Sequence, residues 1–324
     1  MEEIRLETHS GPRNILIAVE DSEHSLEAVR YVGRILPAEE LGITLFHVLN
    51  PVPECFYDLE LAPSFGSQVA GYHTWQAEQK RMIQDFMDRA RDLLFDLGRP
   101  RKAISVLIQE RETGVARDIA KKAREGFDTL VVGRRWMSEV RDLILGSIAH
   151  KLVTYLNQTT VWVVGGQPDP ARILVAMDSS DGAGRALDYV WETFGRSHPE
   201  ILLLHVARGL DCLRPDGEGT VLGAHWIERA REEIEKAERA MAIVFEESID
   251  RLEQRGADVI RIKTKIVPGV YSRAAAILGE AREEDCGTIV VGRRGLSRVE
   301  EFFMGRVSNK VLQMAREMAV WLVH

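Results

Sequence analysis

The sequence has little of several features that would point to particular classes of protein. Only three cysteines occur in 324 residues, at Cys55, Cys212 and Cys286, and their spacing matches neither a disulfide framework nor a metal motif. Asp and Glu (50) outnumber Lys and Arg (42), and the net charge of −8 divides evenly between the two halves of the chain. No basic patch is therefore predicted, which argues against nucleic acid or an anionic membrane as a partner.

Long apolar runs and targeting signals are also missing. The apolar runs have the length of strands, so we expect no membrane span, and the first twelve residues lack the apolar core of a secretory signal. With so few cysteines, these absences predict a protein of the reducing cytoplasm. Neither a P-loop lysine motif, nor a G-x-S-x-G elbow, nor a cluster of metal ligands occurs, so we expect no enzyme and no bound metal.

What the sequence does contain is a repeat of its own first half. The segment NILIAVEDS at 14–22 returns as RILVAMDSS at 172–180, and ITLFHV at 43–48 returns as ILLLHV at 201–206. TLVVGRR at 129–135 returns as TIVVGRR at 288–294, and the three offsets are 158, 158 and 159 residues. Two copies of one domain are therefore predicted, over 1–165 and 171–324, with a short turn-rich linker between them.

Each copy alternates strand-like and helix-like patterns. Nearly continuous short apolar runs are typical of strands covered on both faces, and alternation with helices predicts an α/β fold with a parallel sheet. Long second helices are predicted over 75–97, with Met82 and Ile83 in its apolar stripe, and over 226–252. The ten predicted strands are 15–19, 44–48, 104–108, 129–132 and 160–164 in the first copy, then 173–177, 202–206, 259–266, 288–291 and 319–323 in the second.

The last predicted strand, 319–323, would form an edge of the second sheet. An edge strand exposes unpaired backbone groups and favours a partner, and the equivalent strand 160–164 offers one. We therefore expect the two halves to pack as a pseudo-dimer within one chain, with Trp162 and Trp321 as neighbours. Association of two chains into a homodimer stays open.

The segment after the fourth strand carries the most specific pattern. The first copy reads GRRW at 133–136 and, nine residues later, Gly146-Ser147; the second reads GRRG at 292–295 and, nine residues later, Gly305-Arg306. Glycine after a central strand lets a ligand approach the backbone, and free N–H groups at a helix start favour phosphate. In open parallel sheets, ligands bind at this carboxyl edge.

This G-x-x-G-x9-G-S/T spacing, a first strand that ends in Asp and the L-H-V of the second strand resemble the universal stress protein family, over roughly 14–165 and 172–324. The resemblance implies, for each half, a Rossmann-like, doubly wound, five-stranded parallel sheet in the order 3-2-1-4-5. It also implies an ATP site at the strand ends. The residues it assigns are Asp178, Val206, Gly292, Gly295, Gly305 and Arg306 in the second half, and Val48, Gly133, Gly146 and Ser147 in the first.

Both copies depart from the family pattern, in different places. In the first half, Glu20 replaces the Asp and Trp136 replaces the second glycine, so we expect a degenerate site there. In the second half, Arg306 replaces a hydroxyl residue, and an arginine can pair with phosphate. The sequence thus favours a stress-response protein whose C-terminal half binds ATP or another adenine nucleotide as a regulatory ligand.

Other interpretations stay open. In one, Trp136 and Arg306 close both sites, and the loops 52–73 and 207–223 hold a protein partner or an apolar small molecule. In another, Glu20-Asp21 marks a phosphoacceptor receiver, although the Asp and Lys that a receiver needs on later strands are missing.

Some polar residues favour structural roles over functional ones. The arginine pairs after the fourth strands fit a solvated tip, or ion pairs with the other copy, better than a grip on phosphate. His47 and His205 lie within apolar strands, which favours hydrogen-bonded core residues over catalytic bases.

Overall fold

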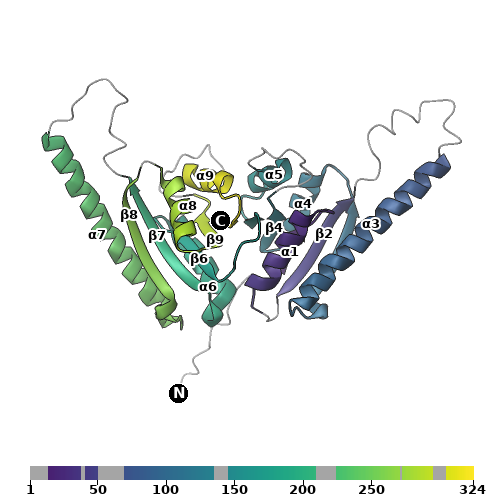
Figure 1. Cartoon of the computed structure of the whole chain (residues 1–324), viewed down its shortest axis with the longest axis horizontal. Helices are drawn as coiled ribbons and strands as arrows, with labels where there is room; N and C mark the ends of the chain where they lie inside the picture. Colours follow the sequence, from purple (N-terminus) through teal and green to yellow (C-terminus); the bar gives the residue numbers. More distant parts are fainter. Residues whose placement is uncertain are drawn as a thin grey trace, which may run out of the picture.

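The chain forms one continuous ten-stranded sheet in the computed structural model, flanked by helices on both faces (Figure 1). The structure describes residues 14–37, 41–49, 69–134, 145–208, 224–270, 272–294 and 304–324. The strand order is β3-β2-β1-β4-β5-β10-β9-β6-β7-β8, so each half has the parallel order 3-2-1-4-5 that the family resemblance implied. The strands are β1 Asn14–Ala18, β2 Gly42–Leu49, β3 Ile104–Glu110, β4 Thr129–Gly133, β5 Thr160–Val164, β6 Arg172–Ala176, β7 Glu200–Arg208, β8 Ile262–Val270, β9 Thr288–Gly292 and β10 Ala319–Val323.

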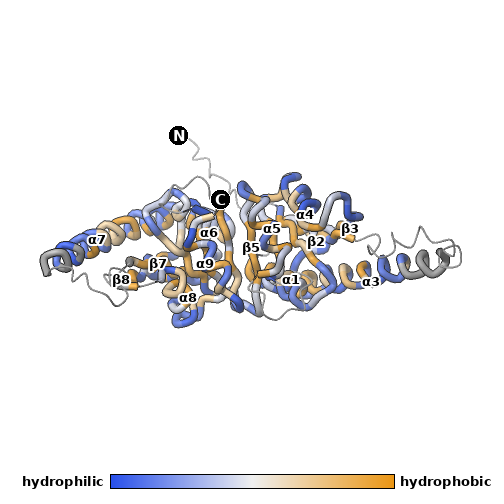
Figure 2. Tube along the Cα trace, turned by 90° about the horizontal axis from the view of Figure 1, so that it is seen from above, coloured by the Kyte–Doolittle hydropathy of each residue, from blue (hydrophilic) through white to orange (hydrophobic). Residues whose placement is uncertain are grey.

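Two apolar layers run through both halves, one on each face of the sheet. One layer takes in α1 and α3 from the first half and α6 and α7 from the second; the other takes in α4, α5, α8 and α9. The long helices α3 and α7 flank the two ends of the molecule, as Figures 1 and 2 show. The helices are α1 Glu23–Ile35, α3 Val69–Asp96, α4 Val115–Ala123, α5 Ser147–Tyr155, α6 Asp181–Phe194, α7 Ala224–Gln254, α8 Arg273–Glu283 and α9 Arg306–Met314.

The strand sequences are apolar throughout because both of their faces are covered. Along β1, Ile15 and Ile17 belong to one layer, whereas Leu16 and Ala18 belong to the other, and all four side chains are fully buried. This alternation follows from the two-residue period of a strand. A strand with one solvated face would have shown polar residues at every second position.

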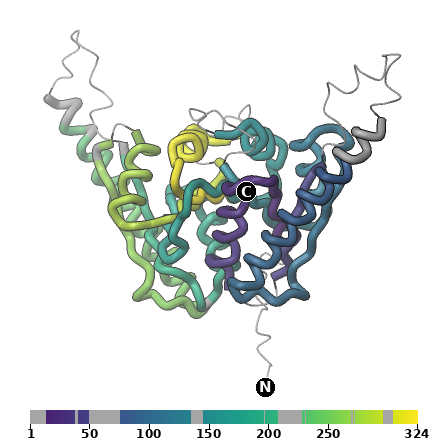
Figure 3. The backbone as a smooth tube through the Cα atoms, turned by 45° about the vertical axis from the view of Figure 1, so that its right-hand side comes forward, coloured from purple at the N-terminus to yellow at the C-terminus, as the bar shows by residue number. Residues whose placement is uncertain are grey.

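The two halves join through their last strands. Strand β10 pairs antiparallel with β5, and Trp321 stands opposite Trp162. The two indole rings are stacked, with centroids 3.8 Å apart and planes inclined by 3°, and both are completely buried. The predicted pseudo-dimer within one chain is therefore confirmed, and its two halves lie side by side in Figure 3. Both tryptophans belong to one apolar cluster, so the seam is a shared core.

Equivalent tyrosines of α1 and α6 form hydrogen bonds across this seam. The hydroxyl of Tyr31 lies 2.7 Å from Thr288 Oγ1 of the other half, and that of Tyr189 lies 2.6 Å from Thr129 Oγ1. Trp321 Nε1 also donates a hydrogen bond to the Tyr31 hydroxyl (3.0 Å). Burial raises the pKa of both tyrosines, so they stay protonated at neutral pH and can take part in these bonds.

A few sequence-based boundaries were wrong. Residues 259–261 form a short 3₁₀ turn (Val259–Arg261) and not the start of a strand, because the side chain of Asp258 accepts the N–H of Ile260 and caps the turn. Helix α3 begins at Val69, inside the predicted loop 52–73. Met82 is 48% exposed, whereas Ile83 is buried, so the apolar stripe of α3 starts one residue later than predicted.

Candidate functional site

The central strand of each half stops short at the carboxyl edge of the sheet. Strand β6 pairs with β7 as far as Ala176 and with β9 as far as Val175, whereas β7 continues to Arg208 and β9 to Gly292. Strand β1 ends in the same way between β2 and β4. The chain order reverses on the two sides of this strand, which is the place where open α/β sheets bind ligands.

The backbone of the second strand passes this point. The N–H of Met177 donates to the carbonyl of Leu204, so alternate residues of β7 direct their polar backbone groups toward β6. Val206 is the next residue with that direction, and it lies beyond the last registered pair. Val48 holds the corresponding position on β2, after the bond from Val19 to Phe46.

The acidic residue after the first strand differs between the halves. Asp178 is partly exposed, and its Oδ1 accepts the N–H (3.0 Å) and the hydroxyl of Ser180. Glu20 is 4% exposed; its Oε1 accepts from the Ser22 hydroxyl at 3.2 Å. The N–H of Glu20 donates to Ser25 Oγ (3.0 Å), and Ala183 stands at that position in the second half. The carboxylate of the first half is thus buried, whereas that of the second half is partly exposed.

The glycine that ends β9 packs against the backbone of α6. A Cβ atom at Gly292 would lie 2.6 Å from the carbonyl carbon and oxygen of Gly182, in the first turn of that helix. Close helix–strand packing therefore requires this glycine, whatever it does for a ligand. His24 stands at the place of Gly182 in the first half, where β4 also ends in a glycine, Gly133.

The glycine-rich loop of each half is closed at its base by one backbone bond. Gly146 N–H donates to the carbonyl of Arg134 at 3.0 Å, and Gly305 N–H donates to that of Arg293 at 2.8 Å. These bonds bring the end of β4 or β9 to the start of the next helix. Residues 135, 136 and 295, and with them Trp136 and Gly295, lie outside the described residues.

Helices α5 and α9 begin at these closures. Their N-caps, Gly146 and Gly305, have φ values of −60° and −63°, which any residue can adopt, and neither has a side-chain cap. What glycine provides is open access to the first-turn N–H groups, which attract anions. Ser147 and Arg306, the first helical residues, are exposed. In α9, Ser308 Oγ also donates to the carbonyl of Gly292 (2.8 Å) and ties the helix start to β9.

Burial separates the two sites. In the first half, Glu20, Gly133 and Gly146 are all buried, whereas Asp178, Gly292 and Gly305 of the second half are partly exposed. Val48 and Val206 are equally buried, at 4% and 5% exposure. The same framework is therefore present twice, but the acidic residue and the glycines of the candidate site are accessible only in the second half, whereas Ser147 and Arg306 are exposed in both.

The first arginine of each pair takes a role that the sequence did not predict. Arg134 is 4% exposed and Arg293 is 3% exposed, so neither belongs to a solvated tip. Each side chain crosses to the other half and donates to a helix carbonyl at 2.6 Å, Arg134 to Gln313 of α9 and Arg293 to Val153 of α5. Burial, and then the neighbouring charge of Arg294, lower the pKa of Arg293 to about 10, so it remains charged at neutral pH.

Both strand histidines are hydrogen-bonded to backbone. Nδ1 of His47 lies 2.8 Å from the carbonyl of Val19, and Nδ1 of His205 lies 2.8 Å from that of Met177. Burial lowers the pKa of His47, which keeps this ring neutral. His47 is buried, as predicted for a core residue, whereas His205 is partly exposed. Each histidine holds the residue that follows the first strand of its half against the second strand.

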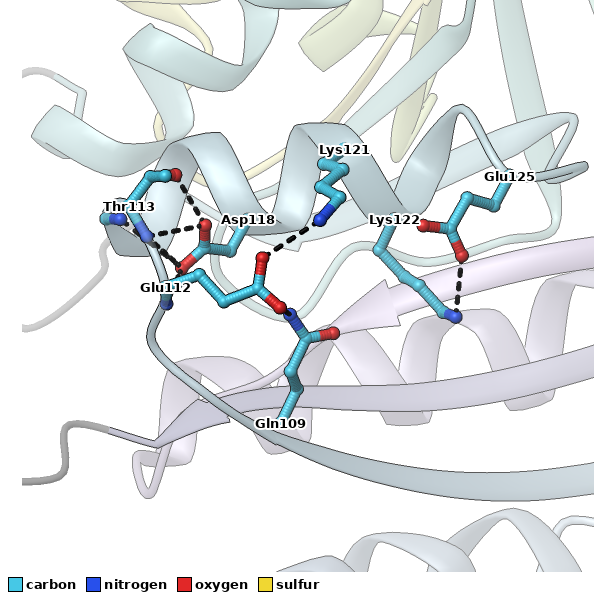
Figure 4. A network of polar contacts seen from close by, with 8 residues as sticks. Gln109, Glu112, Thr113, Asp118, Lys121, Lys122 and Glu125 are labelled. Carbon is cyan, nitrogen blue, oxygen red and sulfur yellow. Dashed lines mark hydrogen bonds and ion pairs between the residues drawn. The ribbon is translucent and has the colours of Figure 1, made fainter.

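A polar network in the first half organises the loop before α4 (Figure 4). The carboxylate of Asp118 accepts the N–H groups of Glu112, Thr113 and Gly114 and the Thr113 hydroxyl. Burial alone would raise the pKa of Asp118, but these hydrogen bonds together hold it below its usual value. When the helix starts Gly114 and Ser272 are matched, Ala276 stands at this position in the second half.

Other kinds of site find little support in the described part of the chain. Within those residues, no three His, Cys, Asp or Glu side chains gather as metal ligands would. None of the helices described is both long and apolar enough to cross a bilayer. Cys286 is a buried free thiol, and Cys55 and Cys212 lie outside the described residues.

Comparison with known proteins identifies relatives over nearly the whole chain. A family model described as the universal stress protein family matches residues 11–165 and 171–324. A universal stress protein of Mycolicibacterium smegmatis is 26% identical over 306 residues, 93% of this chain and 94% of the relative. Universal stress protein YxiE of Bacillus subtilis is 30% identical over 145 residues, 44% of this chain and 93% of its own. The crystal structure of a universal stress protein from Archaeoglobus fulgidus shares the fold, with 18% identity, a TM-score of 0.59, and coverage of 96% of this chain and 98% of that one.

Proposed function

The chain belongs to the universal stress protein family, with the family's domain present twice in tandem, and we propose that its second half binds an adenine nucleotide, in the first place ATP, as a regulatory ligand. The family and the tandem arrangement are those that the glycine spacing and the internal repeat predicted. The proposal concerns what the differences between the two copies of the glycine motif imply: one nucleotide site per chain, in the C-terminal half.

The observation that carries this proposal is the contrast in exposure between equivalent residues. Asp178, Gly292 and Gly305 are partly exposed, whereas Glu20, Gly133 and Gly146 are buried; the next pair, Arg306 and Ser147, is exposed in both halves. A nucleotide needs an acceptor for its base and N–H groups or cations for its phosphates, placed where the ligand can reach them. Only the second half offers both at the carboxyl edge of its central strand.

The chemistry of the second half suits each part of a nucleotide. The carboxylate of Asp178 would accept a hydrogen bond from the exocyclic amino group of adenine, and the backbone of Val206 would contact the edge of the base. The first-turn N–H groups of α9 would bind phosphate at the positive end of the helix dipole, with Arg306 as a cation beside them. Gly295 completes the loop by its place in the sequence, between Gly292 and Gly305.

The proposed role is binding and not turnover. The groups gathered at the carboxyl edge are one carboxylate, backbone amides and an arginine, which recognise a nucleotide but supply no activated nucleophile. A cytoplasmic location, which the composition favours, would expose the site to the cell's adenine nucleotides. Binding would then report their level to a partner protein.

Calorimetric titration of the full-length protein with ATP tests this proposal. We expect one nucleotide bound per chain, and competition by ADP and AMP but not by GTP. Protein as purified should also release adenine nucleotide on denaturation, detectable by absorbance and mass. Two equivalents per chain would contradict the ranking of the halves, and no binding of any adenine nucleotide would favour the interaction module without nucleotide.

A further inference from the structure

Arg134 of the first half reaches the helix that carries the proposed phosphate site of the second. Its Nη2 donates to the carbonyl of Gln313 at 2.6 Å, and the residue is 4% exposed. Gln313 lies in the last turn of α9, where carbonyl groups lack partners within the helix and carry the negative end of the dipole. A guanidinium at this point satisfies a carbonyl and stabilises the helix end.

The backbone of Arg134 is fixed on both sides to its own half. Its N–H donates to the carbonyl of Val164 at 2.7 Å, and its own carbonyl accepts the N–H of Gly146 at 3.0 Å. Strand β5 and the start of α5 thereby hold the residue in place. The side chain therefore acts as a short rigid connection between the first half and α9, and not as a flexible surface arginine.

Helix α9 is tied at both of its ends. Ser308, near its start, bonds to the carbonyl of Gly292 in the same half, and Arg134 bonds to Gln313 at its far end. The nine residues of α9 span about 13 Å, so a tilt at one end displaces the other. The direction of its first-turn N–H groups depends on both attachments.

We propose that Arg134 is a positioning residue for the nucleotide site of the other half, which it serves by fixing the C-terminal end of α9. This inference rests on the proposed function of the second half. It gives the first half, whose own acidic residue and glycines are buried, a direct part in binding. Arg293 of the second half makes the corresponding contact with the carbonyl of Val153 in α5. When Gly146 is matched to Gly305, the residue equivalent to Gln313 is Thr154, the neighbour of Val153, so the two arginine contacts are nearly symmetric.

The test is ATP affinity in the full-length Arg134→Met variant, which keeps the length of the side chain and removes its donors. We expect Kd to rise about tenfold, the size of effect of losing one charge-assisted hydrogen bond. Arg134→Lys, with one ammonium group in place of the guanidinium, should recover part of the affinity. A purely structural role would show no such graded recovery at equal stability.

Arg99 provides the matched control. It is 5% exposed, and it donates to the carbonyls of Gly33 (2.8 Å), Leu36 and Pro37 at the end of α1, entirely within the first half. Like Arg134→Met, Arg99→Met removes a buried arginine that bonds to the C-terminal end of a helix. That helix is α1 and not α9. It should lower the stability of the protein and leave Kd for ATP unchanged.

Hydrogen exchange in ligand-free protein gives a second readout. Amides of residues 306–314 should exchange faster in Arg134→Met than in the wild type or Arg99→Met. Unchanged exchange there, or equal losses of affinity in Arg134→Met and Arg99→Met, would overturn the inference. ATP binding by the wild type that survives Arg134→Met would defeat this inference alone, whereas no binding by the wild type would defeat the proposed function and this inference with it.

Discussion

Matched at their first helix caps, Ser22 and Ser180, the two halves keep the same strands in the same order but differ just beyond the end of the first strand. In the first half Glu20 is buried and bonded to Ser22 and Ser25, and in the second Asp178 is bonded to Ser180 and partly exposed. The glycine loops differ likewise, by Trp136 against Gly295. The carboxyl edge can therefore diverge while the sheet beneath it does not.

At the seam between the halves, by contrast, the two copies have kept equivalent contacts. Tyr31 with Thr288 and Tyr189 with Thr129 repeat one contact in mirrored form, and Trp162 stacks on its counterpart Trp321. A change in either half would there bury an unpaired polar group or open a cavity in a shared core. Packing constrains both copies at the seam, whereas at the edge it constrains single positions such as Gly292.

The largest losses of stability are expected at the seam, where the two halves contribute equivalent residues. Trp162→Ala and Trp321→Ala should each lower the free energy of unfolding by roughly 3–5 kcal/mol, because each empties a large, fully buried site. Trp321→Ala should cost more, since the Tyr31 hydroxyl also loses a donor. Urea unfolding followed by circular dichroism measures both; a loss under about 1 kcal/mol from either change would mean that the seam is not a shared core.

The proposed difference in binding is tested by a pair of acidic substitutions. Asp178→Ala should weaken ATP binding by roughly 1–3 kcal/mol, because an acceptor for the base is removed from the site. Glu20→Ala should leave ATP affinity unchanged, since its carboxylate is buried and bonded to Ser22. Calorimetry on both variants decides the matter, and equal losses would show that both halves bind.

Close packing peculiar to the second half is tested by two glycines of α6. A Cβ at Gly182 would lie 2.2 Å from the carbonyl oxygen of Arg294, whereas nothing lies within 4 Å of one at Gly184. Gly182→Ala should therefore cost roughly 1–3 kcal/mol by overpacking. Gly184→Ala should gain about 0.5–1 kcal/mol from helix propensity. Thermal or urea unfolding measures both, and similar effects at the two positions would refute the packing argument.

The smallest effect concerns the loop network of the first half. Asp118→Asn should cost about 1 kcal/mol at pH 7, because the loop N–H groups lose a charged acceptor. The pKa of Asp118 is lower in the folded state, so its contribution is complete above the unfolded-state value of about 4. It is lost as pH falls through the folded-state value. Urea unfolding should thus show the wild type and variant converging in acid; a constant difference would contradict the assignment.

The candidate site was predictable in part. The spacing of glycines and the acidic residue after the first strand located Asp178, Gly292 and Gly305 on one edge, because parallel strands end together. The same pattern could not reveal that Gly292 also packs against Gly182, or that Ser308 ties α9 to β9. Those contacts depend on how closely a helix approaches a strand, and a residue pattern carries no such distance.

The sequence by itself determined the tandem repeat, the ten strands, the family and the pairing of Trp162 with Trp321. Burial on both faces leaves a periodic apolar pattern, and duplication leaves a constant offset, so both can be read along one dimension. Only the tertiary structure decided that Arg134 and Arg293 are buried and contact the opposite half. It also decided that Glu20 is buried whereas Asp178 is partly exposed. The arginine contacts depend on which helix ends the antiparallel pairing of β5 and β10 brings together. The residues in contact lie about 180 or 140 positions apart in the chain, so no local sequence pattern indicates them.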